Sequence, residues 1–137
     1  MTHVMLVGGD AALLEGLAQA LAALGHTPRV VRTLKEARAW SSAQPPLVLV
    51  VDRMLASEAG ADLLSTPLAS GGARLLYRTS ASPLAPLLPA LQRAVLADLT
   101  LPLERHRLVA LVQSVGERAR LSGRTPKHTP PESSPTL

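Results

Sequence analysis

The sequence predicts an α/β fold, a doubly wound parallel sheet of five strands in a three-layer sandwich, and three observations predict it. Strand-like apolar runs alternate with stretches of helical periodicity, as in βα units joined by right-handed crossovers. Residues 47–51 are five branched apolar side chains in succession, which indicates a central strand buried on both faces. The runs at 28–32 and 96–101 are the weakest and belong at the edges, so the predicted strand order is 2-1-3-4-5.

The first strand and the first helix form the clearest unit. Residues 3–7 are a short apolar run that ends at a pair of glycines. Asp10 stands where a helix N-cap is expected, and leucines then recur every three or four positions over residues 11–24. Gly25 follows as a natural helix stop. We therefore predict a strand and an amphipathic helix here.

The second unit leads into the central strand. A short strand is expected at residues 28–32, and Thr33 and Glu36 have the spacing of a capping box, which predicts a second helix through Trp40. The central run then stops at Asp52. Ligands of open α/β sheets bind at the carboxyl ends of the strands, whereas aspartate is also common where a loop begins. Asp52 is therefore either a functional group or the residue that caps the next loop.

The remaining elements are shorter and are interrupted by prolines. Proline is tolerated in the first turn of a helix and not deeper, so the fourth helix should begin late. In order, we expect a loop over 53–60, a short helix near 61–64, a strand over 73–78, a helix over 87–95, a strand over 96–101 and a helix over 103–118.

The chain divides into a domain over residues 1–120 and a tail over residues 121–137. The tail is rich in Pro, Ser and Thr and has no apolar period, so it should be disordered. It is also basic, because residues 118–137 hold 4 Lys or Arg against one acidic residue. Residues 1–117 hold 10 basic and 9 acidic residues, a balance that does not favour nucleic acid as the partner of the domain.

Composition excludes several classes of protein. The chain has no Cys, so disulfides and thiolate metal sites are excluded, and one Trp with one Tyr cannot build an aromatic stacking surface. No apolar run approaches the roughly 20 residues that span a bilayer, and the first residues do not resemble a secretory signal. We therefore expect a cytoplasmic protein without a membrane partner.

The order of these elements resembles the receiver domain of bacterial two-component response regulators, a CheY-like fold of the flavodoxin type. The matching pieces are the central strand that ends at Asp52, the residues 53–55 after it, Thr79 and Ser80 after the fourth strand, and Leu101 before a proline. The resemblance covers nearly the whole predicted domain.

The resemblance implies roles for several residues. In that family the aspartate after the third strand accepts a phosphoryl group from a histidine kinase, which would be Asp52 here. A Thr or Ser after the fourth strand contacts the phosphoryl oxygens, which gives Thr79 and Ser80. Two acidic residues after the first strand help to hold Mg²⁺, but Gly8 and Gly9 stand there.

Two further family positions also depart from the pattern. Asp10 lies one position beyond the glycines, so Asp10 and Asp52 would make a weak Mg²⁺ site and we expect no bound cofactor. The lysine that offsets the phosphoryl charge is replaced by Leu101, and the aromatic switch position in the fifth strand is Asp98. Because phosphoryl transfer depends on charge neutralisation, we predict a degenerate receiver in which phosphorylation of Asp52 is lost or inefficient.

The family meets its partners on the face of the fourth helix, the fifth strand and the fifth helix. Candidate residues on that face are Leu87, Gln92, Asp98 and Arg105. The expected partner is a signalling protein, such as a histidine kinase or an output protein, and a homodimer through the same face is a second arrangement.

Three functions remain open. The first, which we favour, is a non-enzymatic signalling module that acts by protein–protein interaction, with a working phosphoacceptor regulator as its variant. The second is an enzyme or small-ligand binder that uses the crevice above the first and third strands. The third is a nucleic-acid-associated adaptor that acts through the basic tail, and it requires binding with a steep salt dependence.

Overall fold

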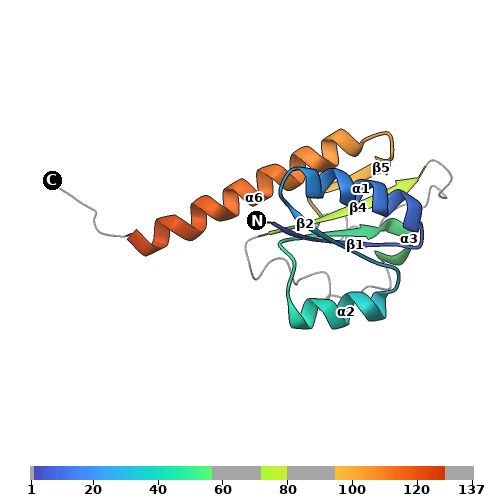
Figure 1. Cartoon of the computed structure of the whole chain (residues 1–137), viewed down its shortest axis with the longest axis horizontal. Helices are drawn as coiled ribbons and strands as arrows, with labels where there is room; N and C mark the ends of the chain where they lie inside the picture. The colour runs from blue at the N-terminus through green and yellow to red at the C-terminus, as the bar shows by residue number, and fades with distance from the viewer. Residues whose placement is uncertain (1, 57–71, 80–94, 129–137) are drawn as a thin grey trace.

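The computed structural model of the chain, in which residues 2–56, 72–79 and 95–128 are described, contains one five-stranded sheet (Figure 1). All four strand pairs are parallel and the strand order is β2-β1-β3-β4-β5, which confirms the predicted fold class and order. The strands are β1 His3–Val7, β2 Thr27–Val31, β3 Val48–Asp52, β4 Ala73–Thr79 and β5 Ala97–Leu101. The described helices are α1 Ala11–Ala23, α2 Leu34–Ala43, α3 Arg53–Ala56 and α6 Arg105–His128.

The described helices cover both faces of the sheet. In Figure 1, α1 and α6 lie on one side of the strands and α2 lies on the other. Alternate residues of each strand point to opposite faces, so β1 sends Leu6 toward α1 and α6 and sends Val7 toward α2 and α3. The larger apolar cluster is the one under α1 and α6, where Leu14, Leu17 and Leu108 are fully buried.

β3 is the central strand. Its four apolar residues have exposed fractions of 0 or 1%, and they alternate between the two apolar clusters. Val50 pairs with Leu6 of β1 on one side and with Leu75 of β4 on the other. An uninterrupted apolar run is what this position requires, since helices cover both faces of a parallel sheet.

Two helix starts follow the sequence closely. The Asp10 carboxylate accepts a hydrogen bond of 3.1 Å from the backbone N–H of Leu13, and it thereby caps α1. The Thr33 hydroxyl accepts one of 3.1 Å from the N–H of Glu36, and the Glu36 carboxylate accepts one from the N–H of Arg32, one residue before the cap. Both N-cap predictions are therefore confirmed.

The structure differs from the predicted elements in two places. Residues 53–56 form the short helix α3, where a loop was expected. The carboxylate of Asp52 accepts a hydrogen bond of 2.9 Å from the N–H of Met54, and this contact turns the chain directly out of β3 into a helical turn. The helices expected near 61–64 and over 87–95 lie outside the described residues, apart from Val95.

The last helix is longer than predicted. α6 begins at Arg105, two residues later than expected, and continues to His128 rather than ending at residue 118. The apolar stripe ends near Val115, but α6 runs on through both Gly116 and Gly123, and an existing helix gains one hydrogen bond for each residue it adds. The first eight residues of the segment expected to be disordered, 121–128, are therefore helical, and residues 129–137 lie outside the described part.

A helix long and apolar enough to cross a membrane does not occur among the described residues.

Candidate functional site

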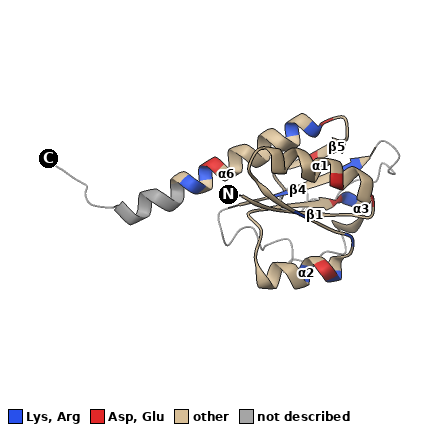
Figure 2. Ribbon diagram, in the orientation of Figure 1, with Lys and Arg blue, Asp and Glu red and all other residues tan. Residues whose placement is uncertain are grey.

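The carboxyl ends of β1, β3 and β4 bring three of the predicted site residues to one end of the sheet. Asp52 is the last residue of β3, Thr79 is the last residue of β4, and Asp10 begins the helix that follows β1. β3 lies between β1 and β4, so Asp52 stands between the other two. Figure 2 shows acidic positions, in red, in α1, in α2 and beside α3 on this side of the molecule.

Asp52 is half-buried, and one of its oxygens is already engaged. Oδ1 accepts the hydrogen bond of 2.9 Å from the N–H of Met54, which is the contact expected of an aspartate that caps the next loop. The contact supports a capping role for Asp52, although the segment that it caps is the helix α3 and not a loop. A capping role does not exclude a chemical role, because the carboxylate has a second oxygen.

Tyr77 of β4 occupies the space between the carboxylates. It pairs with Asp52 in the sheet register, and its side chain is fully buried. A Cβ atom built on Gly8 would overlap the Tyr77 hydroxyl oxygen and lie 3.0 Å from Cζ of the ring. Since β3 separates β4 from β1, the ring must cross the end of β3 to reach Gly8. Gly8 and Tyr77 are therefore closely packed against each other at the carboxyl end of the sheet.

The environment of the Tyr77 hydroxyl is electrostatically unusual. Among the described residues the hydroxyl has no hydrogen-bond partner. Burial raises the pKa of Tyr77 well above its ordinary value, and the negative charges of Asp52 and Asp10 raise it further. The group is therefore a neutral phenol that lies near two carboxylates.

The opposite wall of this site is apolar. Thr79 pairs with Leu101 of β5, and Leu101 is only 1% exposed and belongs to the core under α1 and α6. A cis peptide bond joins Leu101 to Pro102. A cationic side chain is therefore absent from this β5 position. Ser80, the other predicted hydroxyl, lies outside the described residues.

A side chain from α3 connects the site to β5. The Arg53 guanidinium forms an ion pair of 3.2 Å with Oδ2 of Asp98, and the two side chains are only 16% and 28% exposed. Asp98 pairs with Leu76 of β4, so Arg53 reaches across β4 on the face that α2 and α3 cover. Oδ1 of Asp98 is buried and has no partner among the described residues.

The turn between β5 and α6 is closed by a carboxylate. Oε1 of Glu104 accepts a hydrogen bond of 2.8 Å from the N–H of Thr100, and Oε2 forms an ion pair of 3.2 Å with Arg107. The hydrogen bond from Thr100 lowers the pKa of Glu104, and Arg107 lowers it further. The turn is thus held by the ionised form of Glu104.

The predicted partner face is only partly described. Arg105 is exposed at the start of α6, and Asp98 lies in β5, as the sequence placed them. Leu87 and Gln92 lie outside the described residues. Two further apolar side chains near this face are exposed, Leu96 to 47% and Leu103 to 82%.

A cluster of three or more His, Cys, Asp or Glu side chains that could hold a metal ion does not occur in the described ranges. The two carboxylates nearest to such a site are those of Asp10 and Asp52, and each of them accepts a backbone hydrogen bond. The tyrosine ring fills the space beside Gly8. This arrangement does not fit a Mg²⁺ ion well, because that ion requires near-octahedral oxygen ligands.

Sequence reasoning missed Tyr77 and Arg53. Tyr77 is the only tyrosine of the chain, and Gly8 lies 69 positions before it, so only the strand order reveals that they meet. The sequence did carry one signal, a pair of glycines at a strand end where a large side chain from another strand can approach. For Arg53 the sequence shows only that it follows Asp52 directly.

Solved structures with the same fold are numerous. The chain superposes on NtrX from Brucella abortus, in complex with ADP, with a TM-score of 0.70 and 16% identity, over 92% of this chain and 28% of that one. A response regulator receiver domain protein (CheY-like) from Methanospirillum hungatei JF-1 gives 0.68 and 19%, over 89% and 98%. A response regulator receiver domain protein from Clostridium thermocellum gives 0.68 and 14%, over 88% and 98%.

No protein-family model and no curated protein matches the chain. At these identities the solved structures bear on the fold, and the chain spans only about a quarter of NtrX. The strand order, the parallel pairing and the near-complete coverage of two single receiver domains agree with one another. The chain therefore has the fold of a response-regulator receiver domain.

Proposed function

We propose that this chain is a non-enzymatic signalling module of the receiver type that acts in the cytoplasm by protein–protein interaction, with phosphorylation of Asp52 lost or inefficient. The observation that carries the proposal is the close packing of the Tyr77 hydroxyl against Gly8. In receivers an acidic side chain occupies the place of Gly8. Here no side chain of any kind fits beside the tyrosine.

The electrostatics of the site support the same proposal. Phosphorylation would replace the single negative charge of the Asp52 carboxylate with an acyl phosphate that carries about two, beside Asp10 and a buried phenol. Thr79 and Leu101, at the strand ends nearby, supply no positive charge. In water-excluded sites such charge must be neutralised by a metal or by a cation. Neither the carboxylate pair nor the apolar wall offers that neutralisation.

The partner face of the proposal is the surface of β5 and the start of α6. Exposed Leu103 and Arg105 lie at the carboxyl end of β5 and the start of α6, and exposed Leu96 lies at the other end of β5. The ion pair between Arg53 and Asp98 ties this face to the residue that follows Asp52. A histidine kinase or an output protein is the expected partner, and a homodimer through this face is the second arrangement.

The test is incubation with a small-molecule phosphodonor and Mg²⁺, followed by intact-mass measurement. A receiver domain that is known to be phosphorylated serves as the positive control. The variant Asp52→Asn shows whether an added phosphoryl group is attached to Asp52. We expect no added phosphoryl group on the native chain. A phosphoryl group that appears on the native chain and disappears in Asp52→Asn would show a working phosphoacceptor and contradict the proposal.

A repaired variant makes a negative result informative. A Cβ at Gly9 meets no atom within 4 Å, so Gly9→Asp can add a carboxylate without a clash. Combined with Leu101→Lys, it would supply a second metal ligand and the missing cation. We expect this double variant to gain phosphorylation that the native chain lacks, whereas Gly8→Asp should not, because Tyr77 blocks that position.

The competing interpretation, an enzyme or ligand binder that uses the same crevice, is not favoured. The tyrosine ring occupies the space over the end of β3, and the described polar groups there are two capping carboxylates and one strand-end hydroxyl. Such a set lacks the base–nucleophile geometry or the charged clamp that catalysis requires.

A further inference from the structure

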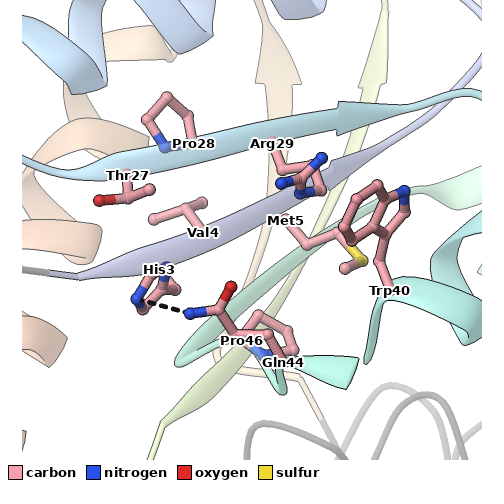
Figure 3. Close-up of a pocket in the computed structure, with 9 residues that line it drawn as sticks. All are labelled: His3, Val4, Met5, Thr27, Pro28, Arg29, Trp40, Gln44 and Pro46. Carbon is pink, nitrogen blue, oxygen red and sulfur yellow. Dashed lines mark hydrogen bonds between the residues drawn. The ribbon is translucent and has the colours of Figure 1, made fainter. Parts of the chain in front are cut away.

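A shallow pocket lies at the opposite end of the sheet, where β1 and β2 begin and α2 ends (Figure 3). Its volume is about 50 Å³. Arg29 of β2 and Trp40 of α2 form one wall, and His3 and Gln44 form another. The face that receivers present to partners lies elsewhere, on β5 and α6. This pocket is therefore separate from the site described above.

The wall of Arg29 and Trp40 is a stacked pair. The guanidinium carbon lies 3.5 Å from the centroid of the indole ring, which is the geometry of a cation–π contact. Figure 3 shows the guanidinium against the face of the indole. Stacking fixes the plane of the guanidinium without using its in-plane N–H donors. Trp40 is 41% exposed, so the pair faces solvent and is not a core contact.

The other polar groups of the pocket complement the arginine. Nε2 of His3 and Nε2 of Gln44 are 3.1 Å apart and form a hydrogen bond across the mouth, visible in Figure 3. The lining side chains include no carboxylate. Among the described residues, the guanidinium of Arg29 has no ion-pair partner. The pocket thus presents fixed donors and positive charge, and it lacks an internal anion to satisfy them.

The lining between these polar groups is apolar. Met5 and Pro46 are buried, and Pro28 is half-buried. A ligand that fits both features carries an anionic group next to a small apolar group. The arginine would bind the anion in a bidentate way, which suits the planar shape of a carboxylate.

The size of the pocket and its position favour a peptide over a metabolite. Pockets for small molecules usually enclose about 300–1,000 Å³, and this one holds no more than a side chain. It adjoins β2, an edge strand whose outer side no described strand covers. The backbone N–H of Thr27 donates to the carbonyl of Thr2, and the carbonyl of Val31 accepts from the N–H of Gly8, so both residues direct their backbone groups toward β1. Successive residues of a strand alternate in this respect, so the backbone groups of Val30 point away from β1. An extended segment could pair there.

We infer that this pocket, defined by Arg29, Trp40, His3 and Gln44, binds an acidic residue in an extended segment of a partner protein, with an aliphatic neighbour packed on the apolar lining. Pro28 limits this pairing, since it lies on the outer side of the edge and has no N–H to donate. Recognition therefore depends on one carboxylate and one apolar side chain of the partner segment, and it does not require a long series of backbone hydrogen bonds to β2.

The single tryptophan of the chain reports directly on this pocket. We would titrate the full chain with the blocked peptide acetyl-Leu-Glu-Leu-amide and follow the emission of Trp40, with the backbone amide shifts of Thr27, Arg29 and Val30 as a second readout. The matched neutral probe is acetyl-Leu-Gln-Leu-amide. The expected result is a saturable change with the Glu peptide and binding at least about tenfold weaker with the Gln peptide, because a charge-assisted pair is lost.

Variants of two exposed arginines separate the pocket from net charge. Arg29→Ala should abolish the discrimination between the Glu and Gln peptides, and Arg29→Lys should retain only part of it because lysine cannot stack and chelate in one plane. Arg32→Ala removes the same charge outside the lining and should bind as the native chain does. Folding of each variant is verified by circular dichroism.

Several outcomes would overturn the inference. They are no saturable change in either readout, equal binding of the two peptides, or undiminished discrimination in Arg29→Ala. A single-stranded oligonucleotide that shifts the same signals when the Glu peptide does not would also overturn it, in favour of a phosphate ligand.

Discussion

The two ends of the same sheet differ in packing and in charge. At the carboxyl end, the ring of Tyr77 is buried against Gly8 and lies near the charges of Asp10 and Asp52. At the amino end, Arg29 and Trp40 are exposed beside an open pocket that has no carboxylate. Receivers use the first end for chemistry. In this chain that end is filled by a buried ring, whereas the other end holds an exposed arginine and an open pocket.

The largest effect should come from Gly8→Ala. The added methyl group would overlap the Tyr77 hydroxyl and lower the free energy of unfolding by about 3 kcal/mol, the upper part of the range for overpacking. In a Tyr77→Phe background the overlap with oxygen is gone, and the loss should fall to about 1 kcal/mol, because contacts of 3.0 and 3.4 Å remain. Urea unfolding followed by circular dichroism measures both.

Gly9→Ala is the matched control for this experiment. Its Cβ would meet no atom within 4 Å, and the change in stability should stay within about 0.5 kcal/mol. Equal losses for Gly8→Ala in the native and Tyr77→Phe backgrounds would show that the tyrosine does not fill the site.

Alkaline pH should unfold the packed end through Tyr77. Its pKa is raised in the folded state, so above about pH 10, where the phenol ionises in the unfolded chain, the unfolded state binds fewer protons than the folded state. Stability is fully present below that pH, and it should fall by up to about 1.4 kcal/mol per pH unit as pH rises toward the folded pKa.

Tyr77→Phe isolates this contribution, since the chain has no other tyrosine. Urea midpoints of the native chain and the variant, measured between about pH 9 and pH 11, should diverge as pH rises. Parallel curves would mean that the phenol is solvated in the folded protein.

A smaller effect is expected for the ion pair of Arg53 and Asp98. The pair is mostly buried, so its coupling energy should be about 1 kcal/mol in a cycle of Arg53→Ala, Asp98→Ala and the double variant. The more exposed pair of Glu104 and Arg107 offers a comparison, and its coupling energy should be smaller than that of the buried pair. A coupling energy near zero for the buried pair would remove the proposed connection between β5 and the site.

The smallest effect should come from the amino end. Arg29→Ala should lower the free energy of unfolding by only about 0.5 kcal/mol, because an exposed cation–π contact is weak. The variant should nevertheless change the emission of Trp40 in the absence of ligand. A loss as large as that of Gly8→Ala would show that this end is a structural contact and not an open surface.

Much of the fold could be predicted because its signals are local. The apolar run of β3, the cap at Asp10 and the capping box at Thr33 each depend on neighbours a few residues away. The strand order followed from which runs were most apolar. The loop expected over residues 53–60 was wrong at residues 53–56, which form α3, and the hydrogen bond from Met54 to Asp52 stands at the start of that helical turn.

The candidate site was less predictable because its contacts join distant segments. The sequence placed Asp10, Asp52 and Thr79 at strand ends, and the structure brings those ends together. Apart from the pair of glycines at the end of β1, it gave no sign that Tyr77 crosses β3 to reach Gly8, because that contact requires the strand order and the direction of the side chain. The length of α6 was missed for a different reason, since an apolar stripe shows where a helix packs and not where it ends.

The central place of β3 has a consequence for hydrogen exchange. Its backbone is bonded to β1 on one side and to β4 on the other, and helices cover both of its faces. Opening of one edge or one helix therefore leaves its amides protected, and only unfolding of the whole sheet exposes them to solvent. The slowest-exchanging amides of residues 48–51 thus report the global stability of the domain, whereas those of the edge strand β2 report local opening.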